Sequence, residues 1–476
     1  MNKKRVLCFT MAAVMAGMLA ACGNTGTSSG NNTGKEETSK SETSKSETSK
    51  SETSKSETSK EETSKEETSK DETGKVESGK SENGDKVNIS FSLWDEVQKP
   101  VFDEIAAKFE EEHPDIHVDV QLTPWSQYWT KLDAAMGADS AADVFWMNTY
   151  LPKYAEAGVL EPLDSYIEKD GVQLSDYAEV VTKAYNYKEV QYCMPKGMDT
   201  VQVFFNRSIF DKYGVEVPKE GWTWDDMTAV AEQLKEKISE QGSDEYPILM
   251  ELDPQPSFFN FIVQNGGYVL SEDNKTAGFD QPETVKAYQD IVDLMDKQLM
   301  PGSEVLSDTK GTDLFLSQKG AILFMGSWKA AVLDEASFAS DIGTIAMPEK
   351  DENNHSVIGG LGFAMNAASK EKDAAWELIK YLSGEESNKM QAEAKIDMPA
   401  LVSAQQYYTP NFKHVDANIF YEAAKTGELF PTSPSVADWL PSVNEISAKI
   451  FAKELTPEEG CQQMQEVTQK ALDSES

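Results

Sequence analysis

Tryptophan side chains stand next to hydrogen-bond acceptors at the ends of predicted strands. Trp94 precedes Asp95 at the end of one apolar stretch, Trp146 lies two residues before Asn148 in another, and Asp199 stands near the start of a third. An aromatic ring offers an apolar face to the C–H groups of a sugar, and aspartate and asparagine accept hydrogen bonds from its hydroxyl groups. The pattern therefore predicts a surface on which sugar rings stack.

Two further tryptophans extend this set. Trp328 comes just after a predicted strand, and Trp439 lies in a loop rich in proline and serine. A single tryptophan in such a place is more often a core residue, but several at the ends of predicted elements favour a stacking surface. The tryptophans within helical patterns or beside a helix start are expected in the core: Trp129, Trp376, Trp222 and Trp224.

The common catalytic and cofactor motifs are missing from the sequence. It contains no GxxxxGK[ST] phosphate loop, no GxSxG elbow and no HExxH, and the glycines at 359–362 are too few for a dinucleotide fingerprint. His113 and His117 have helical spacing, but Pro114 ends the helix that would place them on one face. We therefore expect no enzyme activity, no cofactor and no metal site. Acidic residues are so abundant that no carboxylate pair identifies a glycosidase by itself.

The segments that must position these residues alternate between strand and helix patterns. Apolar residues recur at every second position in 87–93 and 116–122, and at helical spacing in 100–112. This alternation predicts an α/β sheet, in which ligands bind at the carboxyl ends of strands. Thr223 is a predicted helix N-cap. The other expected strands are 144–147, 190–195, 201–206, 321–325, 343–347 and 362–366, and the other expected helices are 125–136, 150–157 and one from 224.

The net charge limits the kinds of binding partner, and the number of cysteines limits the possible disulfides. The formal net charge of the 476 residues is −38, and such a surface repels phosphate backbones, so nucleic acid is excluded as a partner. Cys8 belongs to the N-terminal apolar run and Cys22 follows it, which leaves Cys193 and Cys461. Two cysteines form no disulfide framework, and two separate buried thiols are expected, with a single disulfide as the alternative.

The N-terminus has the composition of an export signal. Three basic residues at 3–5 precede a short apolar run that ends in Leu-Ala-Ala-Cys, with Cys22 as the cysteine. This ending resembles the bacterial lipobox, which implies cleavage before Cys22 and acylation of its sulfur. Acyl chains on Cys22 would anchor the protein to a membrane.

A repetitive segment follows the predicted anchor. A five-residue unit, most often Ser-Glu-Thr-Ser-Lys, repeats ten times from 36 to 85. The unit offers almost no apolar surface to offset the entropy of ordering, so we expect a disordered spacer between membrane and domain.

Short motifs in the remaining chain resemble, in order, those of extracellular solute-binding proteins of sugar importers. They include DVFWMN at 143–148, MGSW at 325–328 and GGLGFA at 359–364, with further matches at 154–164, 194–206, 222–226, 265–268 and 374–380. The family implies a two-lobed, type II clam-shell of the periplasmic-binding-protein class, with a ligand cleft between the lobes. It also implies delivery of the ligand to the permease subunits of an ABC importer by a monomeric receptor on the outer face of the membrane.

The resemblance also assigns positions to the lobes. It places Trp94, Asp95, Trp146 and Asn148 at the cleft in the first lobe, and three more residues in the second: Asp199, Trp328 and Trp439. Further candidate ligand contacts are Trp125, Glu251, Phe258 and Gly360. The stretch 252–257 departs from the family pattern, which leaves the far end of the ligand open.

The expected organisation has four parts. They are a signal peptide at 1–21, an acylated cysteine and linker at 22–85, a first lobe at 86–198 plus 363–412, and a second lobe at 199–362 plus 413–476. The main hypothesis is a receptor for a sugar, most simply an oligosaccharide. Two alternatives remain: a receptor for a cation such as a polyamine, since acidic and aromatic residues also bind cations, and an anchored glycosidase.

Overall fold

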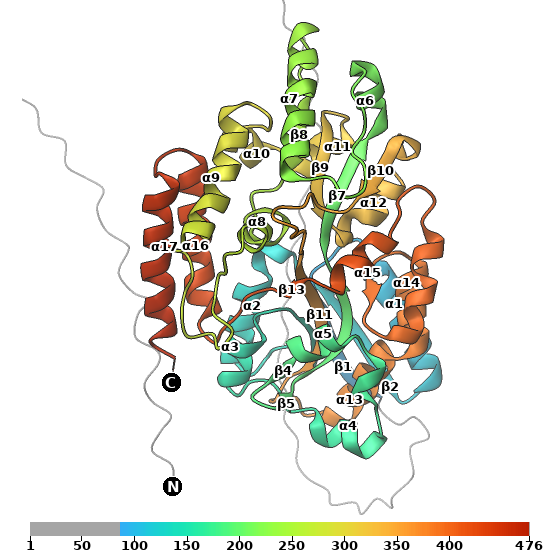
Figure 1. Cartoon of the computed structure of the whole chain (residues 1–476). Coiled ribbons are helices and arrows are strands. Elements are labelled where there is room, and N and C mark those ends of the chain that lie inside the picture. Colours follow the sequence, from blue (N-terminus) through green and yellow to red (C-terminus); the bar gives the residue numbers. More distant parts are fainter. Residues whose placement is uncertain (1–85, 476) are drawn as a thin grey trace, which may run out of the picture. The chain divides into compact units, whose positions relative to one another are not determined.

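The computed structural model of the chain describes residues 86–475. The predicted signal peptide, Cys22 and the repeat at 36–85 lie outside these residues. Within the described part, the strands form a large sheet, a second sheet of four strands and one small hairpin (Figure 1). Among the same residues, no helix combines the length and apolarity that crossing a bilayer requires.

The large sheet has seven strands in the order β12, β6, β11, β3, β1, β2, with β13 beside β11. Strand β1 runs parallel to β2 and β3, whereas β11 runs antiparallel to β3 and β6. Ile89, Phe91 and Leu93 are buried, as the alternation in 87–93 predicts. The strands are β1 Val87–Leu93, β2 Ile116–Leu122, β3 Val144–Met147, β6 Cys193–Asp199, β11 Val357–Met365, β12 Met398–Pro399 and β13 Glu428–Leu429.

Helices of the first lobe pack around this sheet, and a small hairpin lies beside them. Helix α1 ends at the residue before His113-Pro114, where the sequence predicts it to stop. The helices are α1 Lys99–Glu112, α2 Trp125–Gly137, α3 Leu151–Glu156, α4 Asp164–Asp170, α5 Glu179–Ala184, α13 Lys372–Ser383 and α14 Glu385–Glu393; the hairpin is β4 Asn186–Tyr187 with β5 Val190–Gln191.

The second sheet has the order β10, β7, β9, β8. Its strands are β7 Val201–Asn206, β8 Tyr246–Met250, β9 Gly320–Gly326 and β10 Ile342–Ile345. Thr223 caps α7 in a capping box with Asp226, which confirms the predicted helix start. The helices of this lobe are α6 Arg207–Tyr213, α7 Trp224–Glu240, α8 Phe259–Gln264, α9 Pro282–Asp296, α10 Ser303–Asp308, α11 Gly311–Leu316, α12 Ala330–Asp334, α15 Asn418–Ala424, α16 Val436–Phe451 and α17 Pro457–Leu472.

Short helical turns occupy several connections. One of them carries Gln255 and another carries Trp328, and both matter for the site below. These turns are Leu174–Asp176, Pro254–Phe258, Ser327–Lys329, Ala339–Asp341, Val402–Tyr407 and Thr409–Asn411.

Two hydrophobic cores underlie the two lobes. One contains the buried faces of the first sheet and continues through α15 onto one face of the second sheet, where Phe204 and Phe420 meet. The other lies on the opposite face of the second sheet, against α7, α9, α16 and α17. Trp222, Trp224 and Trp376 are buried, which confirms their expected core positions. Cys193 and Cys461 are separate buried free thiols, also as expected.

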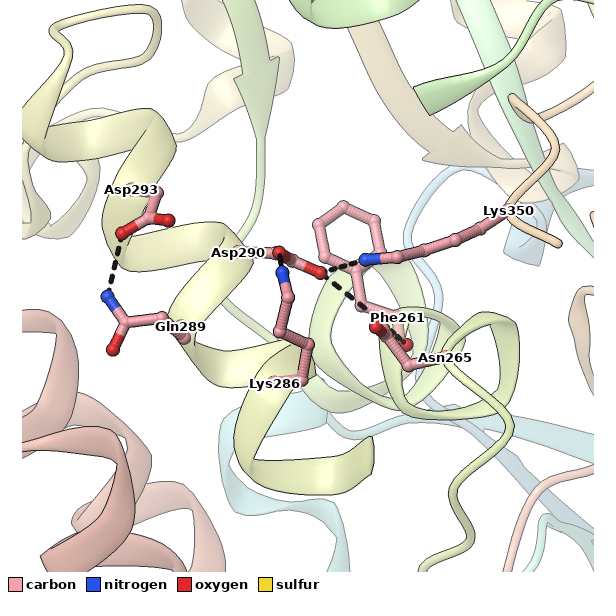
Figure 2. A network of polar contacts seen from close by, with 7 residues as sticks. All are labelled: Phe261, Asn265, Lys286, Gln289, Asp290, Asp293 and Lys350. Carbon is pink, nitrogen blue, oxygen red and sulfur yellow. Dashed lines mark hydrogen bonds and ion pairs between the residues drawn. The ribbon is translucent and has the colours of Figure 1, made fainter. Parts of the chain in front are cut away.

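The chain passes between the sheets at Thr200, and again between β10 and β11. An ionic network fixes this second connection to the second lobe (Figure 2). Asp290 of α9 pairs with Lys286 and with Lys350 of the connection, and it accepts a hydrogen bond of 3.2 Å from Asn265. The ammonium group of Lys350 also lies 4.6 Å from the ring centroid of Trp224. Contacts of Lys350 with Asp290 of α9 and with Trp224 of α7 therefore fix the second-lobe end of the connection.

Two predicted lobe boundaries need correction. The sequence assigns 357–362 to the second lobe, but β11 pairs with β6 of the first sheet from Gly359 onward. The reason is that β11 is longer than its apolar segment at 362–366 suggests, because its glycines weaken the strand pattern. The sequence also assigns Asp199 to the second lobe, but Asp199 ends β6 of the first sheet. We propose that the first lobe comprises 86–199 with 357–412, and the second lobe 200–356 with 413–476, from which β13 returns to pair with β11 in the first sheet.

Candidate functional site

Strand directions bring several predicted site residues to one edge of the first sheet. Strands β1 and β3 are parallel, and β6 points the same way because both β3 and β6 are antiparallel to β11. Their carboxyl ends carry Trp94 with Asp95, Asn148, and Asp199 respectively. This is the edge where ligands bind in open α/β sheets.

The second sheet presents its own edge beside this one. Strand β9 is antiparallel to β7, with Gly326 opposite Val201, and β8 is parallel to β9. Trp328 therefore follows its strand close to the start of β7, which Thr200 alone separates from Asp199, whereas Glu251 follows β8, which lies two strands from β7. The two edges meet at this crossing, with Asp199 at the end of β6 and Trp328 just after β9.

An aromatic cluster forms the first-lobe side. The ring of Trp94 lies 5.2 Å from Trp125, 4.8 Å from Tyr128, 5.7 Å from Trp129 and 5.1 Å from Trp146, measured between centroids. Trp125 remains 52% exposed, whereas Trp146 is fully buried. The cluster thus has a solvent-facing rim and an enclosed base. Sequence reasoning missed the roles of Tyr128 and Trp129, because their helical spacing alone indicates core residues.

Trp328 provides an aromatic face on the second lobe. It is 36% exposed, and its ring lies over Gly326, at which a Cβ atom would collide with the ring. Glycine at 326 therefore allows the ring to lie flat against the strand end. Exposed aromatic faces thus belong to both lobes, at Trp125 and Trp328.

A buried lysine lies beneath the aromatic cluster. Lys196 is fully buried, pairs with Asp397, and donates a hydrogen bond of 3.1 Å to the side chain of Gln98. Its ammonium group also lies 4.8 Å from the ring centroid of Trp146. A lysine within the apolar strand 193–198 requires a buried partner, and that sequence feature could have pointed to this site.

Two indole N–H groups in the cluster have no acceptor. Nε1 of Trp146 and Nε1 of Trp129 are buried without a hydrogen-bond partner in the described part of the chain. Buried donors are normally satisfied, so each such group is a place where water or a ligand oxygen can bind. Trp146 is fully buried and therefore does not present the exposed stacking face that the sequence predicts.

Asp199 connects the two lobes. Its carboxylate accepts a hydrogen bond from Gln255, which belongs to the second lobe, and Gly359 leaves room for both side chains. Burial raises the pKa of Asp199 to about 7; the hydrogen bond from Gln255 opposes this shift, and the charge of Asp397 adds to it. Asp199 can therefore gain or lose a proton near neutral pH.

Asp199→Asn tests this pKa. A free aspartate has a pKa near 3.9, so between about pH 4 and 7 the native state holds a proton that the unfolded state has lost. The stability of the parent should fall as the pH rises through this range, and asparagine removes this dependence. Urea unfolding measures the free energy of unfolding at pH 5 and at pH 8. From pH 5 to pH 8, this free energy should rise by about 2 kcal/mol for Asp199→Asn relative to the parent. If the free energies of unfolding of variant and parent differ by the same amount at pH 5 and at pH 8, the pKa of Asp199 is not raised.

The structure corrects two predicted contacts. Trp439 is fully buried in the second core, where its Nε1 donates a hydrogen bond of 3.0 Å to Ser433. Phe258 is also fully buried, against Phe259 and Tyr288. Neither side chain presents a face to a ligand, because the helices of the second lobe enclose both.

Other predicted residues have local partners. Asn148 accepts a hydrogen bond from the backbone N–H of Tyr150, and Asp95 accepts hydrogen bonds from the backbone of Val97 and Gln98. The carboxylate of Glu251 accepts a hydrogen bond of 2.7 Å from Thr312. These bonds orient the side chains and occupy part of their acceptor capacity.

Gly360 lies apart from the aromatic cluster. It lines a separate cavity of about 1080 Å³ together with residues of α5, the loop after α8 and the segment around β13. The lining includes neither the exposed tryptophans nor Asp199. Gly360 therefore lies on a different surface from Trp125 and Trp328, although Gly359, which lines the same cavity, adjoins Asp199.

Comparison with known proteins gives consistent matches. Residues 80–389 match the family described as bacterial extracellular solute-binding protein. The chain is 27% identical over 290 residues to a maltotriose-binding protein of Pyrococcus abyssi, covering 60% of this chain and 59% of that protein, so the match spans less than two thirds of the relative. It is 24% identical over 367 residues to a galactooligosaccharide-binding protein of Bacillus subtilis, covering 74% and 82%.

Solved structures show the same fold. An ABC substrate-binding protein of Listeria monocytogenes, in complex with cycloalternan, superposes with a TM-score of 0.74 at 25% identity, covering 82% of this chain and all of that one. A maltose-bound protein of T. maritima superposes with a TM-score of 0.70 at 18% identity, covering 81% and 99%. The predicted two-lobed α/β clam-shell is thereby confirmed. With its ordered motifs, its two facing strand edges and the match over 80–389, the chain belongs to the bacterial extracellular solute-binding proteins.

Proposed function

We propose that this protein is an extracellular receptor that binds an oligosaccharide between its lobes and delivers it to the permease subunits of an ABC importer. It binds its ligand without transforming it. The ATPase that drives import belongs to other chains, in keeping with the missing phosphate loop.

The observation that carries this proposal is the pair of exposed tryptophans on adjoining lobe edges. Trp125 is 52% exposed and Trp328 is 36% exposed, and hydrogen-bond acceptors such as Asp199 lie near the crossing. Aromatic faces combined with carboxylate and amide groups suit a sugar, which has both C–H faces and hydroxyl groups. The names of relatives support the same class of ligand, namely maltotriose, galactooligosaccharide and cycloalternan.

Binding requires the lobes to act together. If one ligand touches residues of both lobes, it binds the closed arrangement more tightly and shifts the population toward it. The crossings at Thr200 and between β10 and β11 are the places where rotation would be absorbed.

A ligand screen tests the proposal directly. Maltotriose, galactotriose, N,N′-diacetylchitobiose and spermidine would be added during thermal unfolding. A ligand at about 100 times its dissociation constant stabilises the protein by roughly 2.7 kcal/mol, which gives a clear shift. The sugar that binds should also lower the radius of gyration in X-ray scattering. A shift with spermidine alone, or tight sugar binding without compaction, would contradict the proposal.

Replacing Trp328 should weaken this binding. Trp328→Ala removes the second-lobe stacking face, at a cost of about 1–3 kcal/mol in binding, by analogy with base stacking on aromatic side chains. The variant should keep the melting temperature of the parent within a few degrees, because the side chain is partly exposed. Calorimetry with the bound sugar measures the loss. Val402→Ala, which also trims an exposed apolar side chain, should bind like the parent.

The membrane anchor is a further part of the proposal. Leu19-Ala20-Ala21-Cys22 follows a short apolar run, and the repeat at 36–85 would separate the domain from the membrane. Cys22→Ala should release the protein into the medium or leave it unprocessed, because no sulfur remains to carry the lipid. Fractionation and metabolic labelling with palmitate measure this outcome. A variant that stays acylated and membrane-bound would disprove the anchor at Cys22.

A further inference from the structure

Two carboxylates stand opposite each other where the first sheet meets the second lobe. Strand β12 pairs antiparallel with β6, with Met398 opposite Met198 and Pro399 opposite Gly197. Continuing this register by one position places Asp397 opposite Asp199. Residues directly opposite in an antiparallel pair project from the same face. The sequence, in which these two residues are far apart, gives no indication of this pairing.

Glycines make room for both carboxylates. A Cβ atom at Gly197 would collide with the carboxylate of Asp397, and one at Gly359 would collide with that of Asp199 and with Gln255. Three neighbouring strands thus leave a space that the two acidic side chains and Gln255 share. Any larger residue at either glycine would displace a carboxylate.

The charges in this space do not balance. Lys196 is the ammonium group that contacts Asp397, and its side chain is fully buried while that of Asp397 is 14% exposed. The carboxylate of Asp397 interacts electrostatically with those of Asp199 and Asp95. Asp397 thus has two further carboxylates near it and pairs with one ammonium group, in a region where low polarisability strengthens repulsion.

We propose that Asp199 and Asp397 together select the charge of the ligand, accepting hydrogen bonds from neutral or amino sugars and rejecting sugar acids. This inference rests on the proposed sugar-receptor function. The role of Lys196 is to fix the carboxylate of Asp397 and to oppose the effect of burial, which raises its pKa, and Gln255 orients Asp199 from the other lobe. A ligand hydroxyl or ammonium group supplies a donor to the carboxylates, whereas a ligand carboxylate supplies none and adds a further negative charge.

The raised pKa of Asp199 agrees with this arrangement. Burial is its main cause, and the charge of Asp397 adds to it. A proton on Asp199 at acidic pH would relieve part of the repulsion of a sugar acid. Discrimination should therefore be stronger at pH 8 than at pH 5.

The test compares sugars that differ mainly in charge. Galactotriose is matched with trigalacturonate, and N,N′-diacetylchitobiose with the diamine chitobiose, by calorimetry at pH 8 on the full exported protein. For the pair whose neutral member binds, we expect the acid to bind at least 10-fold more weakly, or the amine to bind at least as tightly. An acid within 3-fold of its neutral partner, or an amine bound more than 10-fold more weakly, would overturn the inference.

Variants connect this selectivity to the two residues. Asp397→Asn alone leaves Lys196 buried without its counter-ion and can fail to fold, so the double variant Lys196→Met with Asp397→Asn is used beside it. The double variant leaves the net charge of this space unchanged, so Asp199→Asn is added to it to remove a negative charge. In the resulting triple variant the neutral sugar should bind about 10-fold more weakly, and the preference over its acidic partner should fall to within 3-fold. Glu216→Gln removes an exposed negative charge elsewhere and should keep the preference of the parent.

The outcomes separate the two proposals. If no neutral, amino or acidic sugar binds the parent, the receptor function fails and the inference fails with it. If neutral sugars bind but the folded triple variant retains the full preference, the receptor function stands and charge selection by Asp199 and Asp397 is disproved.

Discussion

Asp334→Ala should lower the free energy of unfolding by about 3–5 kcal/mol, the cost typical of breaking a buried ion pair on one side. Asp334, at the end of α12 in the second lobe, is buried and pairs with Lys395 of the segment after α14, at 3.0 Å. Its carboxylate also accepts hydrogen bonds from the backbone N–H groups of Lys413, His414 and Val415. Alanine leaves an ammonium group and three backbone donors without this acceptor.

The pH dependence gives an independent check. Burial acts to raise the pKa of Asp334, but hydrogen bonds from Val415, His414 and Lys395 outweigh it and hold the pKa below its usual range. The stabilisation is therefore present above the unfolded-state pKa, near 3.9, and is lost as the pH falls through the lower native value. Urea unfolding at neutral pH measures the main effect.

A neighbouring carboxylate provides the control. Glu335 also pairs with Lys395, at 2.9 Å, but its side chain is 71% exposed. Glu335→Ala should therefore cost no more than about 1 kcal/mol, since exposed ion pairs contribute little. Similar losses from Asp334→Ala and Glu335→Ala would show that burial and the backbone hydrogen bonds are not what makes Asp334 important.

Trp439→Ala should destabilise the protein by about 3–5 kcal/mol, as truncation of a large buried aromatic side chain does. Trp439 is fully buried in the second core, and its indole N–H is bonded to Ser433. The loss combines a cavity in the core with the lost hydrogen bond to Ser433. Chemical unfolding measures it, and the ligand-free protein suffices.

Trp439→Phe distinguishes a core role from ligand contact. Phenylalanine fills most of the volume, so stability should fall less than with alanine, and affinity for the bound sugar should stay within about 2-fold, well under 1.4 kcal/mol. Trp328→Ala should show the opposite behaviour, with lost affinity and retained stability. A folded Trp439→Phe protein that binds 10-fold more weakly would restore Trp439 to the ligand site.

Much of the local structure follows from the sequence because local patterns have local causes. Alternating apolar residues at 87–93 fix a strand, His113-Pro114 ends α1, and Thr223 with Asp226 starts α7. Each depends on residues within one or two turns, so each can be identified without knowing the neighbours. The ordered motifs likewise identify the family and, with it, the two-lobed fold.

The composition of the site depended on tertiary structure. Lys196 and Asp397 meet although 201 positions separate them, and Gln255 reaches Asp199 from the other lobe. Which strands become neighbours, and in which register, is set by packing of the whole sheet, and hydrophobic periodicity carries no information about it.

The exposure of each tryptophan also depended on tertiary structure. Trp125 and Trp328 are exposed at the lobe edges, whereas Trp439 is enclosed by the helices of the second lobe. All three occupy similar sequence contexts, near the ends of predicted elements. The sequence by itself therefore determined the elements, the family and the kind of chemistry. Only the tertiary structure decided which rings face solvent, because exposure depends on segments that pack against a residue from far away in the chain.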